Sequence, residues 1–93
     1  MNRQEAAETL ALQALTWLAG NDDLFPVFLD ASGVSAADIA VDAGKPVFLG
    51  SVLDFVLTDD AWVIAFCDAV SLPYGAPMMA RMALPGGEQT NWT

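Results

Sequence analysis

The chain has 93 residues, of which 55% are hydrophobic, and it contains no histidine. Twelve acidic residues against Arg3, Lys45 and Arg81 give a net charge of −9 at pH 7. A surface with this net charge repels phosphate backbones and anionic lipid headgroups, so we expect no nucleic-acid or membrane binding. The missing histidine removes the commonest general acid–base group in catalysis.

The first part of the chain predicts two helices. Apolar residues recur at spacings of three and four over about residues 4–19, and Gly20 and Asn21 follow as a C-terminal stop. The core face predicted for this helix consists of Ala7, Leu10, Ala11, Ala14, Trp17 and Leu18. Asp22 and Asp23 are predicted to cap a second helix to about residue 31, with Pro26 in its first turn and Gly33 after its end.

The middle of the chain predicts a very short helix followed by a longer one. Ser35 and Asp38 have the spacing of a capping box for a helix to about residue 41, and Gly44 ends it. Pro46 then suits the first position of a helix over about residues 46–57. This helix is predicted to bury Phe48, Leu49, Val52, Phe55 and Val56 and to present Val47, Gly50, Ser51 and Asp54 outward.

Two further helical stretches complete the fold. Thr58, Asp59 and Asp60 are predicted to cap a helix to about residue 70, and a last stretch covers about residues 77–84. The inward face predicted for the first of these consists of Trp62, Val63, Phe66, Ala69 and Val70. No segment alternates at period two, so no strand is predicted. We expect an all-α fold, a small orthogonal bundle of five to six short helices with a helix-turn-helix-like middle, in a single domain over residues 1–84 and an irregular C-terminal tail over residues 85–93.

Residues 33–44 resemble the helix-turn-helix of tetracycline-repressor-type regulators. A recognition helix needs Arg, Lys, Asn or Gln to read base edges and cations to bind phosphates. The following segment offers only Lys45 as a cation, so we expect the helix order without DNA binding.

Reactive side chains are scarce. Cys67 lies in the middle of a predicted helix with no cation nearby in sequence, so an inert, half-buried thiol is expected. The pairs Asp22-Asp23 and Asp59-Asp60 precede helices, where capping explains them better than metal binding. We therefore predict no catalytic residue, metal site or cofactor and no enzymatic activity. A single cysteine permits no internal disulfide, which favours the cytoplasm.

Four residues are candidates for contact with a partner: Leu12, Ile64, Arg81 and Trp92. Leu12 and Ile64 are apolar residues on otherwise polar helix faces. Arg81 suits either an internal ion pair or a partner contact, and Trp92 either folds back on the core or anchors a partner, because Trp and Arg dominate interface energies.

Several short motifs also occur together: Phe28-Leu29 before Gly33-Val34, Phe48-Leu49 before Asp54, and a C-terminal block of Ala80-Arg81, Leu84-Pro85-Gly86-Gly87 and Trp92-Thr93. With these residues the chain resembles a family of short, uncharacterised alphaproteobacterial proteins classed as a domain of unknown function. The resemblance covers nearly the whole length. It implies a bacterial, cytoplasmic, all-α domain and no particular reaction, cofactor or ligand.

Taken together, these features predict a non-catalytic protein-interaction module with a protein partner or a homodimer, because high hydrophobicity in a small domain leaves apolar surface exposed. Two alternatives stay open. One is a small-ligand-binding domain whose pocket is walled by Trp17, Trp62, Phe48 and Phe66. The other is a degenerate helix-turn-helix domain that no longer binds DNA.

Overall fold

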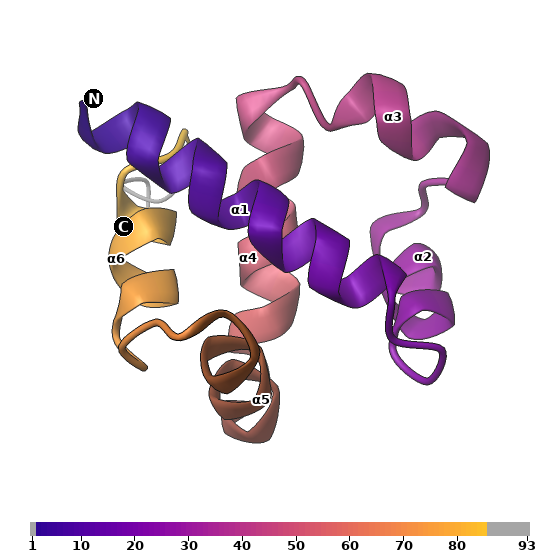
Figure 1. The fold of residues 1–93 in the computed structure, drawn as a ribbon. Helices are drawn as coiled ribbons and strands as arrows, with labels where there is room; N and C mark the ends of the chain where they lie inside the picture. The colour runs from indigo at the N-terminus through magenta and orange to yellow at the C-terminus, as the bar shows by residue number, and fades with distance from the viewer. Residues whose placement is uncertain (1, 86–93) are drawn as a thin grey trace, which may run out of the picture.

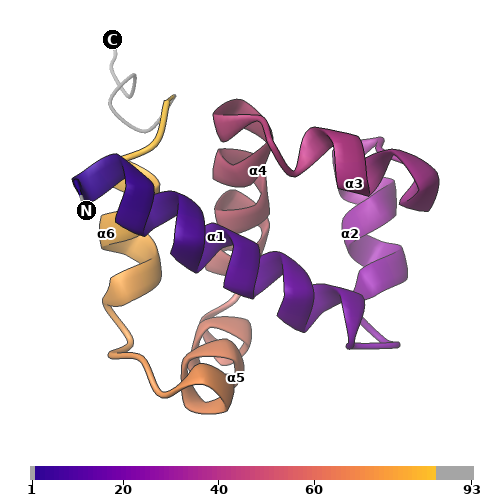
Figure 2. The same cartoon turned by 45° about the horizontal axis from the view of Figure 1, so that its top comes forward.

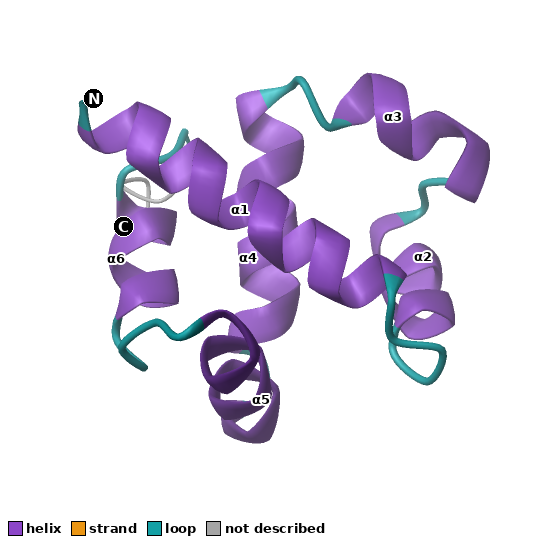
Figure 3. Ribbon diagram, viewed as in Figure 1, coloured by secondary structure: helices purple, strands orange, loops and turns teal. Residues whose placement is uncertain are grey.

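The computed structural model describes residues 2–85, which form helices joined by short turns and contain no strand (Figure 3). This confirms the predicted all-α fold. In chain order the elements are α1 (Arg3–Ala19), α2 (Phe25–Ser32), a 3-10 turn η1 (Ala36–Asp38), α3 (Ile39–Asp42), α4 (Pro46–Leu57), α5 (Asp60–Val70) and α6 (Ala76–Met82).

The helix starts follow local capping chemistry. At the start of α1, the Asn2 side chain accepts a hydrogen bond from the Glu5 amide at 2.7 Å, and the Glu5 carboxylate accepts one from the Asn2 amide at 3.3 Å. This reciprocal pair is a capping box. The Asp59 carboxylate caps α5 by accepting from the Ala61 amide at 2.8 Å, as predicted.

The start of α2 differs from the prediction. The Asn21 side chain accepts hydrogen bonds from the amides of Asp23 and Leu24, both at 3.1 Å, so Asn21 and not an aspartate orders this turn. Because α2 begins only at Phe25, Asp22 and Asp23 lie in the turn before the helix rather than at its cap position. The capping box predicted at Ser35 is also absent, because its hydroxyl donates to the Asp38 carboxylate at 3.0 Å instead of capping the backbone.

Within residues 2–85, the end of α2 is the place where backbone geometry requires a glycine. Gly33 has a φ of +74°, in the left-handed region, and its amide donates to the Leu29 carbonyl. A side chain at that φ is strained, so glycine at this position ends the helix at low cost.

Helix α4 is the centre of the bundle. It packs against α1, α2, α5 and α6, and α1 crosses in front of it in both views (Figures 1 and 2). Helix α6 lies beside the N-terminal half of α1, and α5 lies below α4 in Figure 1. The predicted order of short helix, turn and longer helix is present as α3 followed by α4, although α3 does not pack extensively on α4.

The core is continuous and contains no polar side chain among the described residues. Full burial of a large apolar side chain contributes about 1.5–3 kcal/mol. Leu15 and Leu53, which the helical periodicity did not place inward, are buried, whereas Ala69, predicted inward, is exposed. The largest fully buried side chains are those of Phe28, Phe66, Leu18, Leu53, Leu84, Val52, Val56, Pro77 and Cys67.

Candidate interaction surface

An apolar groove lies along the junction of α1 and α6. It has a volume of about 280 Å³, and its lining includes Ala6 and Leu10 of α1 and Met79 and Ala83 at α6. Alanines on both helices keep the groove shallow and apolar. The charged residue in the lining of this groove is Arg3, at the N-terminal end of α1.

A second groove lies further along α1, where this helix meets the end of α5. It has a volume of about 420 Å³ and is lined by Leu12, Trp17 and the polar residues Thr9, Gln13 and Thr16 of α1, and by Val70 of α5. The hydroxyls of Thr9 and Thr16 donate to carbonyls one turn earlier, at 3.0 and 2.9 Å. These two hydroxyls are therefore already satisfied and do not demand a polar ligand.

The two grooves lie on adjoining faces of α1. Ala6, Leu10, Gln13 and Trp17 follow one another at spacings of four, three and four, which places them in a single stripe along the helix. We call this surface the α1 seam: Ala6, Leu10, Leu12, Gln13 and Trp17 of α1 with Val70 of α5 and Met79 of α6. The seam extends over about 17 Å at 1.5 Å per residue.

Methionines enlarge the seam on the α6 side. Met78, Met79 and Met82 are all exposed, and their spacing places them together on the outer face of this seven-residue helix. Methionine is flexible and polarizable, which suits adaptable protein-binding surfaces. The helical period did not identify this exposed patch, because three methionines within five residues are equally compatible with a buried helix face.

The four residues predicted for interaction do not come together. Leu12 is 41% exposed and belongs to the α1 seam, whereas Ile64 is exposed on α5 but lines neither groove. Trp92 lies outside the described residues, as do residues 86–93 as a whole.

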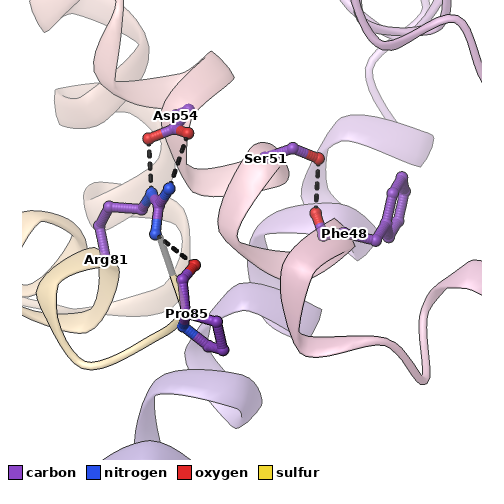
Figure 4. Close-up of polar contacts among 5 residues, drawn as sticks. All are labelled: Phe48, Ser51, Asp54, Arg81 and Pro85. Carbon is purple, nitrogen blue, oxygen red and sulfur yellow. Dashed lines mark hydrogen bonds and ion pairs between the residues drawn. The ribbon is translucent and has the colours of Figure 1, made fainter. Parts of the chain in front are cut away.

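Arg81 forms the internal ion pair that was one of its two expected roles (Figure 4). Its Nε donates to one carboxylate oxygen of Asp54 at 2.6 Å, and a terminal nitrogen donates to the other at 3.1 Å. The second terminal nitrogen donates to the Pro85 carbonyl at 3.1 Å. The Arg81 side chain is only 16% exposed, so this planar contact joins α6 and the segment after it to α4.

Gly50 lies directly beneath this guanidinium and is buried, in contrast to the predicted outward position. A Cβ atom added there would lie 3.0 Å from a terminal nitrogen of Arg81 and 3.4 Å from the Pro85 carbonyl oxygen. Ser51 is half-buried and donates its hydroxyl to the Phe48 carbonyl at 2.6 Å (Figure 4). Arg81 of α6 therefore covers Gly50 on the α4 face that was predicted to point outward, while Val47 and Asp54 stay exposed.

A third hollow, of about 290 Å³, lies between α2 and α4. Phe28 and Phe55 line it, with ring centroids 5.4 Å apart, and Asp54 is at its edge. The four aromatic residues predicted to wall a ligand pocket are distributed differently. Phe48 and Phe66 are buried in the core, Trp62 stacks on Phe55, and Trp17 lines the second groove.

Cys67 is completely buried, more deeply than the half-buried position expected from sequence. Its thiol donates a long hydrogen bond to the Pro73 carbonyl at 3.4 Å. Burial raises the pKa of this thiol above its ordinary value, and the negative charge of Asp68 raises it further. Both effects disfavour the reactive thiolate.

We expect Cys67 in the folded protein to react with Ellman's reagent far more slowly than in the unfolded chain. Because its pKa is raised by folding, its contribution to stability is constant below the ordinary value of 9.0 and falls as the pH rises beyond it. Denaturant unfolding of wild type and Cys67→Ala between pH 7 and pH 11 measures this difference. Rapid labelling of the native protein at pH 8, or an equal pH dependence in both chains, contradicts the assignment.

Within residues 2–85, no three His, Cys, Asp or Glu side chains gather closely enough to hold a metal ion. In the same part of the chain, no helix combines the length and the hydrophobicity that crossing a membrane requires.

A family model described as a protein of unknown function (DUF3572) matches residues 4–87. No curated protein and no solved structure matches the chain.

Proposed function

The chain belongs to the DUF3572 family, and we propose that it is a non-catalytic protein-interaction module whose partner binds the α1 seam. The observation that carries this proposal is the alignment of two apolar grooves along one stripe of α1. A small domain gains nothing in stability from leaving such a stripe in water. Contiguous exposed apolar surface of this kind marks an interaction site more often than scattered single residues do.

The composition of the seam favours a protein as the ligand. Trp17, in the second groove, is a large, half-buried aromatic of the type that anchors interfaces, and Met79 is an adaptable contact on the α6 side of the first groove. The grooves are open to solvent and lie between helices instead of enclosing a cavity. A partner helix or loop fills such a surface better than a small molecule does.

The hollow between α2 and α4 supports small-ligand binding less well. Its volume is just below the range of about 300–1,000 Å³ that is typical for ligand pockets. The Asp54 carboxylate at its edge already binds Arg81 through both oxygens, so its charge is largely neutralised for a cationic ligand.

A DNA-binding role is also less well supported. The exposed face of α4 is reduced by Arg81, which covers Gly50 and pairs with Asp54. The net charge of −9 opposes phosphate binding over about a Debye length. Among the cellular compartments, we propose the bacterial cytoplasm, where a lone, fully buried thiol stays reduced.

Affinity capture with a matched pair of variants tests this function. The double variant Leu12→Asn/Met79→Asn changes one residue in each groove, and Val41→Asn/Val47→Asn makes the same chemical change on α3 and α4. The control valines are 70% and 71% exposed and line none of the three hollows, so they are at least as accessible as Leu12 and Met79.

We expect wild type and the valine variant to capture the same protein from native cells and the seam variant to lose at least about nine-tenths of it, because two buried apolar anchors contribute more than tenfold in affinity. The purified partner is then titrated against all three chains. Equal binding to the seam variant, or capture of no protein by any chain, contradicts the proposal.

A further inference from the structure

We propose that the C-terminal segment, residues 86–93, docks into the groove between α1 and α6 of its own chain, with Trp92 in the groove and the Glu88 carboxylate paired with Arg3. The segment itself lies outside the described residues. The place where it leaves the bundle, its charge and the shape of the groove carry the proposal. This contact within one chain goes beyond the function proposed above and does not depend on it.

The segment leaves the bundle beside the groove. Ala83 lines the groove together with Arg3. Directly after it, Leu84 is buried, and the Pro85 carbonyl accepts a hydrogen bond from Arg81 at 3.1 Å. The last described residues are therefore held in place next to the groove, and the segment starts from a fixed point.

The length of the segment permits a return to the groove. Glu88 follows Pro85 by three residues and Trp92 follows it by seven, which correspond to about 10 Å and about 24 Å of fully extended chain. The part of α6 that lines the groove is only about 10 Å long. Two glycines come directly after Pro85 and allow the chain reversal that such a return requires.

Charge favours this groove over the other two hollows. Within residues 2–85, Lys45 and Arg81 each form an ion pair with an aspartate, whereas Arg3 forms none. All acidic residues of the chain except Glu88 lie in that same range, and Glu88 is the only charged side chain of the segment. The second groove has no charged residue in its lining, and the hollow between α2 and α4 offers only the carboxylate of Asp54. Only the groove between α1 and α6 therefore complements an acidic segment.

The groove suits a large, flat side chain. Its lining consists largely of alanines from both helices, and its volume is about 280 Å³. Met79, which is 66% exposed, offers a thioether sulfur to an aromatic ring, and such contacts are favourable. Because the segment is tethered close by, its effective concentration at the groove is in the millimolar range, so a weak contact is enough to keep the groove covered.

Methyl NMR of the full chain tests the proposal. In wild type carrying ¹³C-methyl methionine, we expect a nuclear Overhauser effect between the indole protons of Trp92 and the methyl group of Met79. Trp92→Ala is expected to move the Met79 resonance and to leave that of Met78 in place, because Met78 lines none of the three hollows. An unchanged Met79 resonance in Trp92→Ala overturns the proposal.

A charge swap tests the ion pair. Arg3→Glu is expected to lower the ratio of docked to undocked segment about twofold to fivefold, the range of a surface ion pair, and Arg3→Glu/Glu88→Arg is expected to restore the wild-type Met79 resonance. Lys45→Glu is the matched control, because it makes the same change in charge at a residue that does not line the groove. A wild-type resonance in Arg3→Glu, or no recovery in the double variant, contradicts the pairing.

Concentration separates the possible occupants. A contact within one chain gives a Met79 resonance that is independent of protein concentration. A Trp92-dependent shift that appears only as the concentration rises identifies a second copy as the source of the indole and overturns the contact within one chain. If Trp92 has no effect on Met79 while capture of a cellular protein still depends on Leu12 and Met79, the docked segment is wrong and the interaction function stands.

Discussion

Replacing Phe66 with alanine is expected to lower the free energy of unfolding by about 3–5 kcal/mol. Phe66 is completely buried on α5, and its ring centroid lies 5.8 Å from that of Trp17 in a tilted arrangement. The loss combines the transfer of the ring to water with the cavity left beneath Trp17. That cost is a large part of the roughly 5–15 kcal/mol that stabilises a typical domain.

Ile64→Ala is the matched control for this change. It lies two residues away on α5 and is 44% exposed, so we expect a change within about 0.5 kcal/mol. Urea unfolding followed by circular dichroism measures both variants. Because the Trp17 ring packs against Phe66, Phe66→Ala is also expected to shift tryptophan emission in the native state. A loss below about 1 kcal/mol for Phe66→Ala shows that the ring is not part of the core.

Replacing Gly50 with valine is expected to lower the free energy of unfolding by about 2 kcal/mol, through overpacking against Arg81. The Cβ position is 3.0 Å from the terminal nitrogen and 3.2 Å from the central carbon of the guanidinium, which two partners hold in place. Gly50→Ala has a smaller expected effect. The gain of about 1 kcal/mol in helix propensity offsets the small displacement that one methyl group requires.

A double-mutant cycle with Arg81→Ala isolates this contact. Once the guanidinium is removed, the two shortest contacts of a Cβ at position 50 are gone and the 3.4 Å approach to the Pro85 carbonyl oxygen remains, so the cost of valine is expected to fall by at least about 1 kcal/mol. Asp54 is left without its partner but is 57% exposed, and solvent then compensates much of its lost ion pair. Additive effects of the two substitutions contradict the placement of Arg81 over Gly50.

Local signals predicted the helices where the caps are strong. The bounds of α4 and α5 agree with the sequence-based expectation, because Pro46 suits the first position of a helix and the Asp59 carboxylate caps the next one. At α2 the prediction was wrong because two aspartates look like caps, whereas the asparagine before them makes the hydrogen bonds. Several adjacent cap-forming residues leave the start of a helix ambiguous.

Packing between distant segments was less predictable. The helical period places Gly50 on the polar face of α4. Its burial is explained by the contact with Arg81, 31 positions later in the chain. Leu15 and Leu53 lie at the edges of the predicted apolar faces, and the tertiary neighbours of α1 and α4 decide their burial. Helical period alone does not determine how wide a buried face becomes.

The candidate surface was predictable only in part. Leu12 was identified because an apolar residue among polar neighbours is visible in the sequence, and the structure places it in the second groove. Leu10 and Trp17 were predicted as core, yet both are only half-buried and line grooves. Their position on the border between core and seam depends on how α5 and α6 dock, and no single-helix pattern contains that information.

Methionine methyl labelling tests the central claim most directly, because a partner in the seam must contact α6. The chain has four methionines, and Met78, Met79 and Met82 all lie on α6. When the purified partner is added to protein carrying ¹³C-methyl methionine, the Met79 resonance is expected to shift with the same saturation curve as the titration of that partner. Saturable binding that leaves the Met79 resonance in place contradicts a partner site in the α1 seam.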